Sequence, residues 1–134
     1  MKKYIFVFTI LLAIGFISNT LFAQLTVSSI TVVNTTNCVP SAEPSALDLT
    51  CSHVCKSQVV NVNPHSAVAV PFPCAGADAL SGGYYTIVGI FDPATNSGVK
   101  VGNGCGVNLS GTFKDCQGIT RTATFIAPNT VNIQ

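Results

Sequence analysis

The placement of cysteine most constrains what this chain can fold into, because all six cysteines lie downstream of an N-terminal hydrophobic leader. The leader has a basic start at Met1-Lys2-Lys3, an apolar run from Tyr4 to Phe16 and a small residue, Ala23, at its end. This pattern is typical of a secretory signal peptide. In an oxidising compartment an even number of cysteines indicates disulfide bonds. The sequence therefore predicts a secreted protein with a signal peptide over residues 1–23 and one disulfide-stapled domain over residues 24–134.

An uncleaved membrane anchor is the alternative to a signal peptide. The apolar run is short for a span of about 20 residues, and no later segment is apolar enough to cross a membrane.

The charges that remain without the leader narrow the class of partner. The net charge is then close to −1, from the cations Lys56, Lys100, Lys114 and Arg121 and the anions Glu43, Asp48, Asp78, Asp92 and Asp115. No basic patch is available to neutralise phosphates, so we expect no nucleic-acid partner and no transmembrane segment in the mature chain.

Hydrophobic residues recur with a period of two, and Gly, Pro and Asn interrupt the pattern at short intervals. This pattern is typical of short β-strands separated by turns. The expected strands cover residues 25–33, 46–51, 58–62, 67–72, 84–91, 99–101, 107–113, 119–126 and 131–133. Two hairpins are predicted. One joins the strands at residues 58–62 and 67–72 through the turn Asn63-Pro64-His65-Ser66, and the other joins the strands at residues 84–91 and 99–101 through residues 92–98. The predicted fold is all-β: a two-sheet antiparallel β-sandwich, or a flattened barrel, of about seven to nine strands.

Cysteine pairing is not fixed by the sequence alone. The best single pair is Cys105 with Cys116, because residues 106–115 can form a hairpin that brings both ends together. A loop of this size would contribute about 3 kcal/mol in the chain-entropy model. Cys38 and Cys74 each end a predicted β run and are a second expected pair. Cys51 with Cys55 is then left, or an exchange of partners among these four cysteines.

One segment offers a metal site as an alternative to a disulfide. Cys51-Ser52-His53-Val54-Cys55 places two sulfurs and an imidazole within one short segment. The spacing differs from the usual C-x2-C, no matching second half follows, and export favours oxidised cysteines. We therefore expect no metal ligands and no cofactor.

Catalytic groups are scarce. The whole chain has only two histidines and five carboxylates for acid and base chemistry. His65 lies in an expected turn, and no Gly-x-Ser-x-Gly motif is present. Asp78 and Asp92 are the candidates for a hydrolytic carboxylate pair, but Asp92 precedes Pro93 in a turn. The sequence predicts that the protein is not an enzyme and has no catalytic residue.

Two loops at the ends of the predicted sandwich are candidate recognition surfaces, residues 75–83 and 92–98. Tyr84 and Tyr85 are candidates for an aromatic platform for a sugar, although alternation along a strand turns one of the two toward the core. The candidate ligand-binding residues are Asp78, Tyr84, Tyr85, Asp92 and Asn96.

Four segments carry a resemblance to known proteins: SSITVVNTTNC, VVNVNPHSAVAVPFPC, VGNGCG and NTVNIQ. Together they resemble small secreted β-sandwich proteins of environmental Gram-negative bacteria, over most of the mature chain. The opening strand into Asn-x-x-Asn-Cys, followed by a Pro-turn-Pro hairpin, is similar to the start of thaumatin-like domains over the front half only. These resemblances imply a β-sandwich fold and transfer no functional residue.

The leading hypothesis is a secreted, non-catalytic binding domain that acts at the cell surface or in the extracellular space on a protein or a glycan. The alternative is a self-assembling structural subunit, because strands at both termini could be donated to a neighbouring copy. A third hypothesis is a secreted inhibitor of a protease or lysozyme that acts through the loop at residues 75–83.

Overall fold

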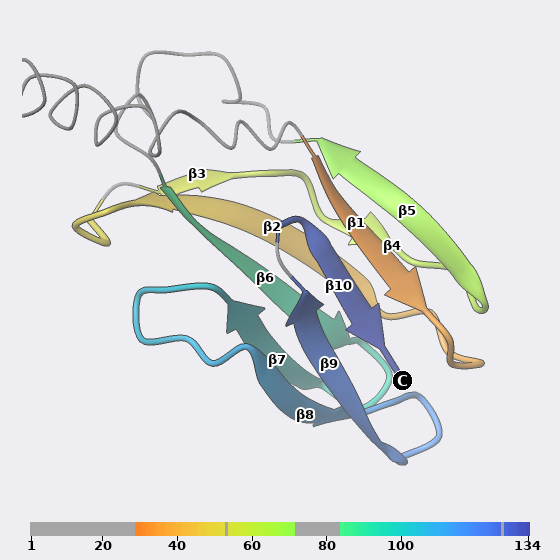
Figure 1. Ribbon diagram of the computed structural model, residues 1–134. Helices are drawn as coiled ribbons and strands as arrows, with labels where there is room; N and C mark the ends of the chain where they lie inside the picture. Colours follow the sequence, from red (N-terminus) through yellow and green to blue (C-terminus); the bar gives the residue numbers. More distant parts are fainter. Residues whose placement is uncertain (1–28, 53, 72–83, 127) are drawn as a thin grey trace, which may run out of the picture.

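The structure, a computed structural model, describes residues 29–52, 54–71, 84–126 and 128–134 (Figure 1). These residues form β-strands and no helix, so no helix among them is long and apolar enough to cross a membrane. The strands are β1 (Ser29–Asn34), β2 (Ser41–Asp48), β3 (Val54–Lys56), β4 (Val60–Asn61), β5 (Ser66–Pro71), β6 (Tyr84–Asp92), β7 (Ser97–Gly102), β8 (Ser110–Lys114), β9 (Thr120–Ile126) and β10 (Thr130–Ile133). The predicted all-β class is confirmed.

The strands form two sheets that pack together. The first has the order β5-β1-β10-β9-β8, and the second has the order β3-β2-β6-β7 with β4 also paired to β2. Among the described strands all pairs are antiparallel except β1 with β10, which are parallel (Figure 1). A parallel pair needs a long connection between its strands, and here the rest of the domain supplies it. The predicted two-sheet sandwich is therefore confirmed, with one parallel pair between its first and last strands.

The core lies between the sheets and follows the alternation of the strands. In β1 every second residue is buried, and the same pattern recurs in β2 and β10. The largest fully buried apolar side chains are Ile30, Ile90, Ile133, Val32, Val62, Val70, Val88, Val101 and Val131. Burying a side chain of this size stabilises a fold by about 1.5–3 kcal/mol, so this set supplies the main driving force for packing the two sheets.

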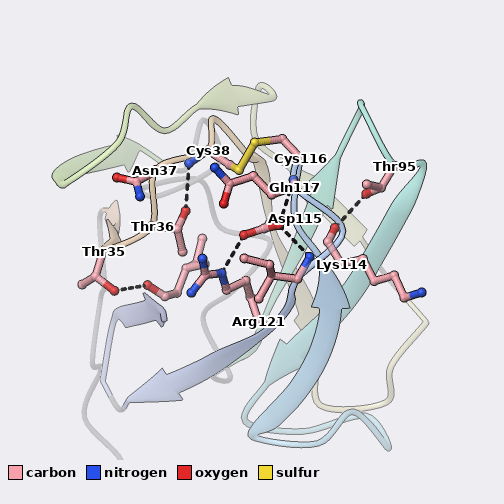
Figure 2. Close-up of polar contacts among 12 residues, drawn as sticks. Thr35, Thr36, Asn37, Cys38, Thr95, Lys114, Asp115, Cys116, Gln117 and Arg121 are labelled. Carbon is pink, nitrogen blue, oxygen red and sulfur yellow. Dashed lines mark hydrogen bonds and ion pairs between the residues drawn. A yellow bond between two sulfur atoms is a disulfide. The ribbon is translucent and has the colours of Figure 1, made fainter.

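One side of the sandwich is closed where β7 meets β8. The Lys114 amide donates to Ser97 Oγ at 2.9 Å. Figure 2 shows that Thr95 Oγ1 donates to the Lys114 carbonyl, at 2.7 Å. The Gly102 amide donates to the Asn108 carbonyl at 3.0 Å. These bonds occupy polar backbone groups at the β8 edge and join the two sheets, which protects that edge from pairing with another chain.

The predicted hairpin around residues 63–66 is wrong. β4 pairs with β2 in the second sheet, whereas β5 pairs with β1 in the first, so the chain crosses between sheets at this point. The buried Asn34 side chain donates to the carbonyls of Val62 and Asn63 and holds the crossing in place. A turn signal alone does not show whether the two flanking strands share a sheet.

β2 is longer than predicted and begins well before residue 46. It contains Pro44, which has no amide hydrogen to donate to a neighbouring strand. Pro44 faces the break between β3 and β4, where its carbonyl accepts from the Ser57 amide at 2.9 Å. No ladder bond is lost there, and a strand forms despite the proline.

Both terminal strands of the domain lie inside the first sheet. β10 lies between β1 and β9, as expected for a strand that completes the sheet, and β1 lies between β5 and β10. Each is therefore paired on both sides. The donation of terminal strands, which motivated the hypothesis of a structural subunit, would require breaking two ladders rather than using a free edge.

Two disulfides join distant segments. Cys38 bonds Cys116 across a separation of 78 residues, and Cys51 bonds Cys105 across a separation of 54. Cys55 is also disulfide-bonded. Cys74 lies outside the described residues, as do the leader over residues 1–23, His53 and the loop at residues 75–83. The predicted disulfide-stapled domain is confirmed. Because Cys51 and Cys55 are both disulfide-bonded, neither offers the thiolate that the alternative of a metal site required.

The predicted pairing of the cysteines is wrong. The hairpin of β8 and β9 closes at Lys114 opposite Thr120, so Cys116 lies in its turn. Cys105 lies before β8, and a strand of five residues spans roughly 17 Å, far more than a disulfide allows between two Cα atoms. The proposed pairs Cys38 with Cys74 and Cys51 with Cys55 are also excluded, because Cys38 and Cys51 have other partners.

Candidate functional site

The outer face of the second sheet carries a groove with a volume of about 650 Å³. The groove crosses β2, β6 and β7, and most of its lining residues on these strands alternate away from the core. Its lining includes Ser41, Glu43, Gly89, Phe91, Lys100 and Val59. Volumes of about 300–1,000 Å³ are typical of small-molecule sites, so this groove is large enough to hold one.

The floor of the groove is a glycine between two charged residues. Register places Glu43 of β2 opposite Gly89 of β6, and Gly89 opposite Lys100 of β7. A Cβ atom built on Gly89 would meet only the Glu43 carbonyl oxygen, at 3.8 Å. The space above this glycine is therefore open. Because neighbouring strands lie about 4.8 Å apart, β2, which carries Glu43, and β7, which carries Lys100, are separated by roughly 10 Å.

Apolar side chains also line the groove. Phe91 is 41% exposed and Val59 is 62% exposed, and Pro93 belongs to the same lining. Glu43 forms an ion pair with Lys56 at 3.7 Å, and Lys100 takes part in no ion pair among the described residues. An exposed pair of this kind contributes little to stability, so both groove charges remain available to a ligand. The groove combines an aromatic face with one acceptor and one donor group.

The sequence placed recognition elsewhere. Asp78 lies outside the described residues. Tyr84 packs against the hydrophobic core, whereas the ring of Tyr85 lies against the backbone of Gly104. The two rings therefore point to different sides, as strand alternation predicted, and do not form a shared platform.

Two further candidates have structural positions. Asp92 was expected in an exposed loop, but it is only 1% exposed and its Oδ1 accepts from the Ala94 amide at 2.9 Å. As the last residue of β6 it continues the inward alternation of that strand, so it does not lie in an exposed loop as expected. Asn96 is exposed in the turn between β6 and β7 with a φ of 51°, a conformation that asparagine tolerates well.

The groove residues were missed because strand faces, and not loops, carry them. Glu43, Gly89 and Lys100 are far apart in the sequence, and only the register brings them into one row. One signal was present: a glycine inside an apolar strand often marks a place where another molecule approaches the backbone. Gly89 interrupts the longest β run in this way.

Asp115 is a structural carboxylate at one end of the sandwich (Figure 2). Burial raises its pKa, but the hydrogen bond from Arg121 Nε at 2.6 Å, the amides of Ile119 and Gln117 and the charge of Arg121 together outweigh this effect. The pKa of Asp115 therefore lies below its usual value. The carboxylate fixes the turn that contains Cys116 and is fully used by these contacts.

Asp48 fixes a second turn, which contains Cys51. A hydrogen bond from the Thr50 hydroxyl and one from the Ser52 amide are the main causes that lower the pKa of Asp48 to about 2. The Thr50 hydroxyl lies 2.7 Å from Asp48 Oδ1. Like Asp115, this group stabilises the fold and is not poised for acid and base chemistry at neutral pH.

The lowered pKa values of these two carboxylates predict loss of stability in acid. A carboxylate with a depressed pKa in the folded state contributes its full stabilisation above its unfolded pKa, and this contribution is lost as the pH falls toward the folded pKa. We therefore expect the urea midpoint to hold down to about pH 4 and to decline from there to about pH 2. Asp48→Asn should reduce this decline. Equal midpoints for the unmodified protein at about pH 5 and about pH 2 would contradict the assignment.

Comparisons of the chain with protein-family models, with curated proteins and with solved structures each found no match.

Proposed function

We propose that this protein is a secreted, non-catalytic binding domain that recognises a glycan in the groove on the outer face of the second sheet. The observation that carries the proposal is the glycine floor at Gly89, which lies between Glu43 and Lys100 and beside the exposed ring of Phe91. This arrangement offers an open, partly apolar surface with polar groups at both sides.

The chemistry of the groove suits a sugar ring. A pyranose has an apolar face of C–H groups and a rim of hydroxyls. The apolar face can pack on the Phe91 ring, and the hydroxyls can donate to the Glu43 carboxylate and accept from the Lys100 ammonium. The lining is apolar for the most part, with few polar groups that fix orientation, as in many small-ligand sites.

Export supports placing this activity outside the cell or at its surface. The basic and apolar leader is typical of a secretory signal peptide. Two disulfides between distant segments suit an oxidising compartment. A small domain gains most from such cross-links where no chaperone can repair it.

A single substitution can close the groove without harming the fold. Gly89→Val should fill the floor, because nothing lies nearer than 3.8 Å to a Cβ at this position. Valine also suits a strand interior better than glycine does, so the free energy of unfolding should stay equal or rise by about 0.5–1 kcal/mol. We expect glycan binding to be lost. Phe91→Ala should weaken affinity by about tenfold, a loss of about 1.4 kcal/mol.

The measurement is a glycan array with the secreted protein, followed by titration calorimetry with the best glycan. Leu109→Ala is the matched control, because Leu109 is an exposed apolar residue, 56% exposed, outside the groove. It should bind like the unmodified protein. Failure to bind any glycan, or unchanged binding by a folded Gly89→Val variant, would remove the proposal. Capture of a peptide in the same groove would replace the glycan with a protein partner.

A further inference from the structure

A buried carboxylate lies beside one of the two described disulfides. The Sγ atoms of Cys38 and Cys116 and a carboxylate oxygen of Asp92 all lie within 4.8 Å of one another. Asp92 is 1% exposed and Cys38 is 2% exposed, whereas Cys116 is exposed. Cys116 is therefore the surface residue of this bridge, and Cys38 lies in the interior together with the carboxylate.

Asp92 is only partly satisfied in this position. Its Oδ1 accepts from the Ala94 amide at 2.9 Å, but its buried Oδ2 has no hydrogen-bond partner. The ion pairs of the described residues join Lys56 with Glu43 and Arg121 with Asp115, so neither of them neutralises Asp92. A buried polar atom without a partner is costly and calls for an explanation, and a role in chemistry is one such explanation.

Three separate elements bring this cluster together. Asp92 ends β6, Cys38 lies in the connection between β1 and β2, and Cys116 lies in the turn between β8 and β9. The Cys38 amide donates to Thr36 Oγ1 at 3.2 Å, which fixes the connection on the interior side. Figure 2 shows the disulfide that bridges this connection and the turn.

We propose that Cys38–Cys116 is an exchangeable disulfide and that Asp92 is the proton acceptor for its closure. The partner is an external disulfide or thiol of low molecular weight, written RSSR and RSH. The roles follow from exposure: Cys116 forms the mixed disulfide because it can be reached from solvent, and Cys38 is the buried nucleophile that resolves it.

Opening and closing balance in atoms and electrons. In opening, an external thiolate attacks Cys116 Sγ, the bond between the two cysteine sulfurs breaks, and its electron pair leaves with Cys38 Sγ. In closing, the Cys116 sulfur, whose proton passes to solvent, first attacks one sulfur of RSSR; the sulfur–sulfur bond of RSSR breaks, the mixed disulfide forms, and the first RS⁻ leaves and takes up a proton as RSH. The Cys38 thiol then gives its proton to Asp92 Oδ2, its sulfur attacks Cys116 Sγ in the mixed disulfide, and the bond between Cys116 Sγ and SR breaks. The released RS⁻ then takes up this proton and restores the carboxylate. Oxidation of the two thiols by one RSSR therefore yields two RSH, and two electrons pass to the external disulfide.

A buried thiol needs such a base, because an apolar environment disfavours its thiolate. Once the sulfur–sulfur bond is broken, the Cys38 side chain is free to turn toward Oδ2. The second described disulfide gives a comparison within the same molecule. Cys51 is exposed and Cys105 is partly exposed, yet no carboxylate of the described residues forms such a cluster with them.

The test follows each bridge separately in the folded protein. The protein is partly reduced with dithiothreitol, closed again with glutathione disulfide, trapped by alkylation at timed intervals and mapped by peptide mass. Asp92→Asn keeps an oxygen for the Ala94 amide but removes the base. We expect this variant to close Cys38–Cys116 about tenfold more slowly, or slower still, and to close Cys51–Cys105 at the unchanged rate. An unchanged rate at Cys38–Cys116 would overturn the proposal.

The unmodified protein provides a second measurement, which also decides the matter if Asp92→Asn does not fold. Accessibility alone predicts that Cys51–Cys105 exchanges at least as fast, because both of its cysteines reach solvent and Cys38 does not. We expect the reverse order, with Cys38–Cys116 the faster bridge. Equal rates, or faster exchange at Cys51–Cys105, would show that Asp92 does not assist. Neither result depends on a ligand in the groove, so this test is independent of the proposed function.

Discussion

Replacing both Cys38 and Cys116 with alanine is expected to lower the free energy of unfolding by about 4 kcal/mol. The bridge joins residues separated by 78 positions, so it removes a large loop entropy from the unfolded chain. Small domains are stable by only about 5–15 kcal/mol, so this loss is a large fraction of the total. Urea unfolding of the variant beside the unmodified protein measures the loss.

The second bridge is a sharp control for this prediction. Cys51 and Cys105 are separated by 54 positions, and loop entropy varies only with the logarithm of loop length. Removing either bridge alone should therefore cost nearly the same, within about 0.5 kcal/mol. A loss of less than about 1 kcal/mol for the Cys38 and Cys116 variant would show that the unfolded chain is already restricted without the bridge.

Strand positions were predictable because the burial that determines them is local. Alternation located the strands near residues 84–91, 119–126 and 131–133 within a few positions of β6, β9 and β10. The two-sheet class followed from the number of short strands and the turns between them. These predictions needed no knowledge of which strands pair.

Pairing could not be read from the same signals. The contact of β1 with β10 joins the two ends of the domain, and no local pattern distinguishes it from other arrangements. The cysteine pairs depend on the same sheet order. One local signal was available: Asp115-Cys116-Gln117-Gly118 is a turn sequence, with Gly118 at a φ of 76°, and this turn places Cys116 away from Cys105.

The candidate site shows the same limit. Gly89 was visible as an unusual residue inside a strand, but the charges beside it belong to β2 and β7. The register of the strands fixes which residues lie beside Gly89 across the sheet. A shift of one residue would turn the side chains of a strand to the other face. Recognition was therefore assigned to loops, where exposed residues are easiest to find in a sequence.

Asn34 offers the second large effect, because its amide is a buried junction between three segments. The side chain is 1% exposed, and its Nδ2 lies 2.8 Å from the carbonyl oxygen of Cys38, 3.0 Å from that of Val62 and 3.1 Å from that of Asn63. Its Oδ1 accepts from the amide and the hydroxyl of Thr36. One side chain thus ties the end of β1 to the connection before β2 and to the crossing between the sheets.

Asn34→Asp keeps the shape and removes the donor. A carboxylate would then face three carbonyl oxygens in the interior, so we expect a loss of about 3–5 kcal/mol in the free energy of unfolding, measured by urea unfolding at neutral pH. Asn132→Asp is the matched control: Asn132 lies on the outer face of neighbouring β10, and we expect a change within about 0.5 kcal/mol. Similar small losses for both variants would show that the Asn34 amide does not hold the crossing. A large loss for Asn34→Asp alone would show that this one buried side chain holds the crossing between the two sheets.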